Sequence, residues 1–408
     1  MKRVSDEWEQ TNRELFVKKP IMVIDMYLSD GRQPLVFDSK ILSLNYNKSG
    51  DLRSSFITQD TVTFTLDNRS GWLSYDADVN DVYKNTLVRI MPGFDLVTHT
   101  GNSIDGGSYY ITSAEMSADK KKIQITAKTI LSFLTRKVGA YSTTCAVIVD
   151  DILDKELNNP NLPGYIEQTP IEYVIDDSLS TIEVEISADD NLNTMEALQL
   201  IANACGCVLY AQNRVIYIVK PSDVTENYVL SNRLCFEFPQ ISYGERVSGV
   251  EVRYNHGESV KFAYPSSETE GGTQIITNPI ITDNANATDV AEVSLDYFIN
   301  SRKKVTANYR FDPRLELFDV IVIPAGNKVG AYCVTKINAT YSGAWRGTIE
   351  AVLLPNVQID LRICDIEMLT IEQLETMQIM QLHPNTISDI DGDYIATSNG
   401  ELPLWKKE

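Results

Sequence analysis

Residues 193–219 read NTMEALQLIANACGCVLYAQNRVIYIV and predict a helix followed by a hairpin. Asn193 and Glu196 have the three-residue spacing of a helix N-cap and its reciprocal capping partner. Apolar residues then recur at helical spacing, so we expect a helix over Thr194–Ala204. Gly206 stands where a left-handed C-terminal cap belongs, because glycine adopts that conformation without a steric penalty.

The hairpin and the residues upstream complete a small α/β module. Val208–Ala211 and Val215–Val219 are apolar runs on either side of a short polar turn, which is typical of a hairpin. Further upstream, Cys145–Leu157 has the apolar spacing of a helix, and Ile182–Ile186 alternates apolar and acidic residues as a half-buried strand does. We place this module at residues 141–221.

The region before the module is rich in strand patterns. Short alternating runs are separated by turn residues such as Asp30-Gly31 and Gly106-Gly107. The predicted strands are Ile21–Tyr27, Ile41–Tyr46, Thr61–Leu66, Leu87–Met91, Tyr109–Ile111 and Ile123–Ala127. Several short strands at this spacing favour a barrel or a sandwich. We therefore expect a first barrel-like β domain over residues 21–140, after an N-terminal segment at 1–20.

A second β-rich region follows the module. The predicted strands are Val247–Tyr254, Lys304–Arg310, Val320–Ile323, Tyr332–Thr340 and Thr348–Leu353, with Ile275-Ile276 and Ile280-Ile281 on either side of Asn278-Pro279. A helix is expected over Asp289–Asn300. We place a second barrel-like domain with a helical insertion at residues 222–357, and a C-terminal helix (Thr370–Leu382) with a polar tail at 358–408. The fold class is mainly β, with two barrel-like domains flanking the helix–hairpin module.

Composition and charge argue against two classes of protein. Hydrophobic residues make up 43% of the chain and charged residues 23%, which is ordinary globular usage. The 36 Lys and Arg against 56 Asp and Glu give a net charge of −20, which disfavours a nucleic-acid binder and docking on an anionic membrane. No apolar run reaches the roughly 18 residues of a spanning helix, and the polar N-terminus carries no signal peptide. We expect no membrane anchor and assembly in a cytoplasm.

The sequence marks out no catalytic, cofactor-binding or metal site, so we expect no enzyme and no cofactor. The three histidines, His99, His256 and His383, lie far apart, and we interpret each as a surface or structural residue. No Gly-rich nucleotide loop or nucleophile motif is present. The six cysteines (Cys145, Cys205, Cys207, Cys235, Cys333 and Cys364) are too sparse for a disulfide scaffold and fit small buried hydrophobes.

Three charged segments can be interpreted either as solvated surface or as functional sites. Asp389, Asp391 and Asp393 have the spacing of the first half of a calcium loop, but Tyr394 replaces its glycine, so we favour a solvated turn and leave calcium binding open. Lys120–Lys122 is expected at a hairpin turn and Arg302–Lys304 after a helix. Both are interpreted as solvated faces, with docking onto an acidic neighbouring subunit as the alternative.

The order of four motifs resembles one known family. They are the helix–hairpin of Asn193–Ile218, the strands of Gly107–Leu134, the segment Ile276–Ile281 with its following helix, and Asp312–Ile323. Together they resemble the tail-tip and baseplate hub proteins of tailed bacteriophages, the structural N-terminal part of the tail-associated lysin family. Phe318 stands where that family usually has a glycine, so we expect the turn to differ there.

This resemblance implies a ring, usually a homotrimer, in which six similar barrels match a six-fold tail tube to a three-fold tip. The implied partners are a tail tube or distal tail protein, the tape-measure protein, and a tip or fibre protein. From its apolar residues we interpret Thr370–Leu382 as a docking helix for that tip or fibre protein, with a simple cap on the core as the alternative. DNA would pass through the ring without specific binding during genome ejection, and the net negative charge suits such a channel. The implied location is the virion tail tip. With roughly 50 residues after the last strand, we expect no lytic domain.

Other functions stay open at this point. The chain can be a different ring or adaptor of the same apparatus, such as a distal tail or tail-knob protein. It can also be a tip protein that binds host glycans, or one that degrades the cell wall with a carboxylate pair that the sequence does not mark. A glycan-binding assay and a wall-degradation assay separate these alternatives from a structural role.

Overall fold

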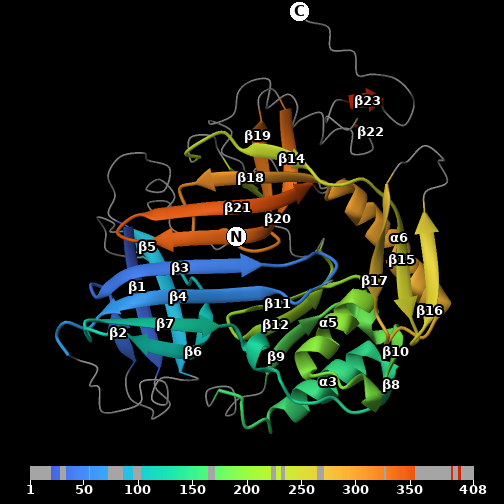
Figure 1. Ribbon diagram of the computed structural model, residues 1–408, viewed down its shortest axis with the longest axis horizontal. Coiled ribbons are helices and arrows are strands. Elements are labelled where there is room, and N and C mark those ends of the chain that lie inside the picture. Colours follow the sequence, from blue (N-terminus) through green and yellow to red (C-terminus); the bar gives the residue numbers. More distant parts are fainter. Residues whose placement is uncertain are drawn as a thin grey trace, which may run out of the picture.

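The computed structural model places the chain in one large sheet with two smaller α/β parts beside it (Figure 1). The structure describes residues 20–27, 34–54, 56–71, 86–94, 103–163, 171–221, 227–230, 235–263, 271–325, 328–353, 387–388 and 394–396. The C-terminal helix predicted at Thr370–Leu382 lies outside these residues.

The first β region has the six predicted strands and one more. The strands are β1 (Pro20–Tyr27), β2 (Leu35–Phe37), β3 (Ile41–Ser49), β4 (Gln59–Asp67), β5 (Leu87–Phe94), β6 (Ser108–Met116) and β7 (Lys122–Lys128), followed by the 3₁₀ turn η1 (Ile130–Phe133). Strand β2 was not predicted because three residues are too few to show an alternation. In β4 the alternation is strict, with Val62, Phe64 and Leu66 fully buried.

The second β region contributes its strands to the same sheet. These strands are β13 (Asn227–Val229), β14 (Gln240–Tyr243), β18 (Lys303–Tyr309), β19 (Val320–Ala325), β20 (Lys328–Tyr341) and β21 (Trp345–Leu353). Strand β20 pairs with β3 from Lys336 opposite Ser49 to Tyr341 opposite Leu44. The resulting 13-stranded sheet runs in the order β14-β18-β21-β20-β3-β4-β7-β6-β5-β1-β2, with β19 joined to β20 and β13 to β19.

The prediction that the two β domains are barrel-like is therefore wrong, because no sheet of the described residues closes into a barrel. The physical reason is that β3, which a closed first barrel would pair with its own strands, is paired along one edge by β20. The mainly β class with α/β insertions is confirmed. The domain boundaries at residues 140, 221 and 357 stay predictions.

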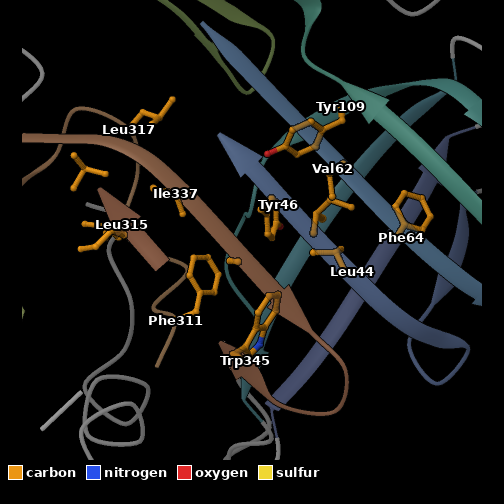
Figure 2. Close-up of a cluster of buried hydrophobic side chains, with 14 of the residues drawn as sticks. Leu44, Tyr46, Val62, Phe64, Tyr109, Phe311, Leu315, Leu317, Ile337 and Trp345 are labelled. Atoms are coloured by element: carbon orange, nitrogen blue, oxygen red, sulfur yellow. The ribbon is translucent and has the colours of Figure 1, made fainter. Parts of the chain in front are cut away.

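The two halves of the large sheet share one hydrophobic core, which Figure 2 shows at their seam. Side chains from the first region (Leu44, Tyr46, Val62, Phe64 and Tyr109) lie beside side chains from the second (Phe311, Leu315, Leu317, Ile337 and Trp345). Burying each large apolar side chain contributes about 1.5–3 kcal/mol, so this seam holds the halves together strongly.

The helix–hairpin module has the predicted elements. It consists of β8 (Tyr141–Thr144), α3 (Cys145–Glu156), β9 (Glu172–Ile175), η2 (Asp177–Ser180), β10 (Glu183–Ile186), η3 (Ala188–Asp190), α5 (Thr194–Ala204), β11 (Val208–Gln212) and β12 (Val215–Val219). The capping box is confirmed, since Asn193 Oδ1 accepts from the Glu196 N–H at 2.9 Å and Glu196 Oε2 accepts from the Asn193 N–H at 2.9 Å. Gly206 has the expected left-handed φ of 63°.

A third part, which we name the α6 subdomain, packs helix α6 (Asn284–Asn300) on the three-stranded sheet of β15 (Val247–Tyr254), β16 (Glu258–Ala263) and β17 (Gly272–Thr277). The helix begins five residues earlier than predicted, because the Asp283 side chain caps it by accepting from the Ala285 N–H at 3.1 Å. Ile280 and Ile281 are buried but lie outside any strand.

Near the C-terminus, the structure describes only β22 (Ile387–Ser388) and β23 (Tyr394–Ala396), which pair with each other. In the described ranges, no helix is long and apolar enough to cross a membrane.

Candidate functional site

The chemically reactive residues of the described chain are dispersed. His256 lies in the turn between β15 and β16, half exposed, with its Nδ1 atom 3.6 Å from Asp190 Oδ1. This position fits the predicted surface role. His99, His383 and the Asp389–Asp393 loop lie outside the described residues. Among the residues that are described, no three His, Cys, Asp or Glu side chains are grouped to hold a metal ion.

Four of the six cysteines pack as predicted, as small buried side chains, and Cys364 lies outside the described residues. Cys145, Cys205, Cys207 and Cys333 are buried and unbridged, and Cys235 is half-buried. Burial raises the pKa of the Cys207 thiol to about 12 and that of the Cys235 thiol to about 11. Because the thiolate is the reactive form, these cysteines are poor nucleophiles near neutral pH.

The module is attached to the large sheet through the loop between β3 and β4. Ser54 Oγ donates to the Cys207 carbonyl at 2.9 Å and accepts from the Leu209 N–H at 3.1 Å. The Thr58 hydroxyl donates to the Leu209 carbonyl. The start of β11 is therefore fixed to the β3–β4 loop through both backbone carbonyls and a backbone N–H group.

Helix α5 is fixed at the same junction. The Asn203 side chain donates to the Arg53 carbonyl at 2.8 Å, and Gln199 donates to the Ser54 carbonyl at 2.9 Å. Asn278, which is fully buried, donates to Asn203 Oδ1 at 2.9 Å and to the Leu200 carbonyl at 2.9 Å. Asn203 thus connects the large sheet, the module and the α6 subdomain, and buried hydrogen bonds of this kind fix one relative orientation.

The turn of residues 312–319 contacts the module from the other half of the sheet. Arg314 and Asp312 form an ion pair of 2.7 Å in which both side chains are nearly buried. Gln212 of the hairpin donates to Glu316, and the rings of Tyr210 and Phe318 meet edge to face at 5.6 Å.

Phe318 shows why this turn is unusual. Its φ is 71°, in the left-handed region that favours glycine, yet its side chain is fully buried. The ring fills the space above Gly50, where an added Cβ would come within 2.6 Å of the phenyl ring. The backbone here keeps a conformation suited to glycine, and the buried ring offsets the cost of placing a larger residue in it.

A cavity of about 520 Å³ lies next to this junction, between the large sheet, helix α5 and the α6 subdomain. Phe56 and Ile275 line its mouth and are 48% and 51% exposed. Lys336 and Glu350 in its wall pair with each other at 2.7 Å. The rest of the lining is a mixture of apolar and polar groups, and it includes two further charged residues, Asp51 and Lys304.

The most exposed apolar residues cluster at the β14 end of the large sheet. Phe238 is 78% exposed and Phe236 is 61% exposed, and Ile241 of β14 is 39% exposed. Sequence reasoning missed these residues, because nothing in the sequence separates an exposed phenylalanine from a buried one. Of the two basic segments that were predicted, Arg302–Lys304 lies beside this strand, since Tyr243 of β14 pairs with Lys303. Lys120–Lys122 lies at the β6–β7 turn, as predicted.

Trp345, whose place the sequence left undetermined, belongs to the core. It is 5% exposed and packs with Tyr46, Phe311 and Tyr341 at ring-centroid distances of 6.3, 5.1 and 4.9 Å. Trp72 lies outside the described residues.

Three solved structures with a similar arrangement of elements are tail proteins. The 43 kDa tail protein of prophage MuSo2 from Shewanella oneidensis superposes with a TM-score of 0.54 at 12% identity, over 82% of this chain and 98% of that one. The tail protein from Neisseria meningitidis MC58 gives 0.53 at 12%, over 81% and 96%. Prophage tail protein gp18 from Listeria monocytogenes EGD-e gives 0.50 at 10%, over 80% and 94%.

No protein-family model matches the sequence, and no curated protein sequence matches it. At 10–12% identity the structural likeness shows the fold alone. The chain therefore has the fold of prophage tail proteins. The predicted resemblance to tail-tip and baseplate proteins is confirmed at this level.

Proposed function

We propose that this protein is a structural component of a phage tail or of a phage-derived injection apparatus. The observation that carries the proposal is the extent of the structural match. It covers 98% and 96% of two tail proteins and about four-fifths of this chain, so the order and arrangement of all three parts are shared. A single common domain would leave most of one chain unmatched.

Within the tail, we propose the position of the hub that joins the tube to the tip. The sequence motifs that suggested it lie in the large sheet, the module and the α6 subdomain. The contacts of the β3–β4 loop and of Asn203 support this role, because a subunit between two stacked rings has to keep its parts in one orientation. The role requires assembly contacts and no bond chemistry.

The finer features follow from the resemblance and belong to the same proposal. Three copies form a ring around a channel, with a tail tube or distal tail protein and the tape-measure protein on one side and a tip or fibre protein on the other. The net charge of −20 suits a channel through which DNA slides, because like charges disfavour phosphate binding. The assembled protein resides in the virion.

Deleting the gene from the phage or prophage that encodes this chain tests the proposal. We expect particles with filled heads that lack tails, or tails without a tip, in electron micrographs, with normal tails restored by a plasmid copy. Normal tails that fail to adsorb would instead favour the glycan-binding alternative. Normal tails that adsorb but leave the wall intact would favour the wall-degrading one.

Light scattering of the purified chain across a concentration series tests the ring. A mass of three 45.8 kDa chains supports the trimer. A mass of one chain at every concentration, both alone and with the neighbouring tail proteins added, contradicts it.

A further inference from the structure

The end of the large sheet at β14 exposes a row of apolar side chains to solvent. We define the β14 surface as Phe236, Phe238 and Ile241 together with the cations beside them. Phe238 is the most exposed large hydrophobic side chain in the described part of the chain. Grouped and exposed aromatic residues mark interaction sites more often than single ones do. In the strand order, β14 is the terminal strand of the sheet.

Four cations border this row. The Arg346 guanidinium lies 5.8 Å from the centre of the Phe236 ring, at one end of the row. Arg302 and Arg246 lie at the other end, where the Gly244 N–H donates to the Arg302 carbonyl at 2.8 Å. Lys304 of β18, which is exposed and pairs with Ser242 of β14, lies beyond them and also lines the cavity described above. None of the four forms an ion pair with a carboxylate of the described residues.

Two acidic side chains, Glu237 and Glu245, are exposed on the same segment. Glu237 accepts a hydrogen bond from Asn308 within the sheet. The cations outnumber these acids, so the β14 surface is apolar and basic in a protein whose net charge is −20. Such a surface fits an acidic partner with apolar residues of its own.

The same chain carries a surface of that kind. The module, residues 141–221, has 13 acidic residues and three basic ones, which gives it a net charge of −10, half that of the whole chain. Glu183 and Glu185 are exposed on β10 while Val184 and Ile186 between and beyond them are buried. Thr144 of β8 pairs with Glu183 of β10. Val147, which is 55% exposed, lies three residues after Thr144 in the chain.

One copy cannot easily bring these two surfaces together. The module is fixed to the sheet by the buried hydrogen bonds of the β3–β4 loop. In Figure 1, β10 and α3 lie at the lower right of the molecule and β14 lies at the top. A second copy can place its module against the β14 surface without changing either fold.

We propose that the β14 surface of one copy binds the β10 surface of the module of a second copy. The contact joins two different patches, so it is head-to-tail, and repeating it gives a ring when the rotation closes. The phenylalanines supply most of the affinity, and the charges set the orientation and the rate of association. The inference rests on the proposed function and names the surface by which its ring assembles.

A charge-reversal series in the full chain tests the orientation. Arg302→Glu with Arg346→Glu is expected to weaken self-association at least about tenfold, as measured by analytical ultracentrifugation in low salt. Lys121→Glu with Lys122→Glu, a pair of exposed cations at the β6–β7 turn, is the matched control and leaves association unchanged. Adding Glu183→Lys and Glu185→Lys to the first pair restores association, although these changes alone weaken it.

A second series tests the apolar row. Phe236→Ser with Phe238→Ser is expected to shift the protein to monomer, while Val36→Ser with Val293→Ser, two other exposed apolar residues, leaves the oligomer intact. Unchanged thermal unfolding of each variant monomer shows that the fold survives. Carbodiimide cross-linking of the wild type is expected to join Lys304 of one copy to Glu183 or Glu185 of another.

Two outcomes overturn the inference. An oligomer that survives both sets of changes assembles through another surface, and the proposed tail function then stands. A β14 surface that binds a different tail protein while the chain stays monomeric also contradicts self-assembly. The deletion mutant tests the tail function separately, because normal tails in that mutant would contradict the tail function whatever the result for the β14 surface.

Discussion

The helix–hairpin module and the large sheet are specified by the sequence in different ways. Every element of the helix–hairpin lies within residues 193–219, and its caps, turn and pairing involve neighbours in the chain. The sheet instead depends on the pairing of β3 with β20, in which Leu44 lies opposite Tyr341. Local contacts can be deduced from spacing, whereas a pairing across almost 300 residues cannot.

The two regions also differ in where they keep their polar groups. The described carboxylates of the module are exposed or half-buried, with the exception of Glu156, which is fully buried and accepts from the Thr135 N–H at 2.9 Å and from the Thr194 hydroxyl at 2.8 Å. The sheet buries Tyr46, Tyr109 and Tyr309, and burial raises the pKa of each phenol well above its usual value. Burial acts to lower the pKa of the nearby Lys48 amine, but the Asp60 and Glu316 carboxylates outweigh it and raise that pKa.

The largest expected effect is a loss of sheet stability at alkaline pH. Because the folded pKa of each buried tyrosine lies above its unfolded value of 10.0, its contribution is complete below pH 10 and is lost as the pH rises further. Each tyrosine lowers the unfolding free energy by about 1.4 kcal/mol per pH unit above that point, or about 4 kcal/mol for the three.

Denaturant unfolding between pH 8 and 11.5 measures this slope, and hydrogen exchange shows which region opens. Tyr109→Phe is expected to remove about a third of the slope. The control Tyr243→Phe, in a side chain that is 47% exposed, leaves it unchanged. Ionisation of all tyrosines while the chain is still folded would contradict the prediction.

The second effect is a cavity in the seam of the sheet. Phe64→Ala removes a fully buried ring from β4 and is expected to lower the unfolding free energy by about 3–5 kcal/mol. Hydrogen exchange in β3 and β20 is expected to accelerate more than exchange in α5. Val36→Ala, at a residue that is 60% exposed, is the control, with a change of about 0.5 kcal/mol or less. Equal acceleration in the module would show that the two regions unfold as one unit.

The third test uses Phe318, which touches both regions. Phe318→Ala loses the ring contacts with Tyr210 and keeps a Cβ in a left-handed backbone, whereas Phe318→Gly loses the ring but relieves that strain. We expect both variants to be destabilised by about 2–4 kcal/mol, with the glycine variant about 1 kcal/mol more stable than the alanine variant. Thermal unfolding measures the difference, and an alanine variant as stable as the glycine one would argue against backbone strain.

The smallest effect is local to the module. Asn193→Ala removes the side-chain acceptor of the capping box and is expected to cost about 1 kcal/mol. Asn158→Ala, at an exposed asparagine after α3, is the matched control and should change stability little. Amide exchange in the first turn of α5 is the readout. If exchange accelerates in α5 but not in the large sheet, the effect of the cap is local to the module. Equal acceleration in both regions would contradict this prediction.

These contrasts explain what the sequence could predict. The Asn193–Glu196 box and Gly206 were identified because each carries its own chemistry, and they are confirmed. Closure of the β domains was predicted wrongly, because strands such as β3 show which residues are buried but not which strand they pair with.

The β14 surface was missed for a related reason. Apolar side chains in a core and at an interface have the same composition, so Phe236 and Phe238 in the sequence do not differ from buried phenylalanines such as Phe64. Only the fold shows that they lie just before β14, the strand that ends the sheet. The basic segment Arg302–Lys304 was recognised as a solvated or docking face, and its position next to β14 makes the second interpretation testable.

The pairing of β3 with β20 has a consequence for synthesis of the chain. When the ribosome has completed Leu44, its partner Tyr341 is still almost 300 residues from being made. At about 5–20 residues per second, the edge of β3 waits roughly 15–60 s for its neighbour. An unpaired strand edge can associate with another nascent chain during that time, so slower translation or the loss of chaperones should reduce the yield of this protein more than its final stability suggests.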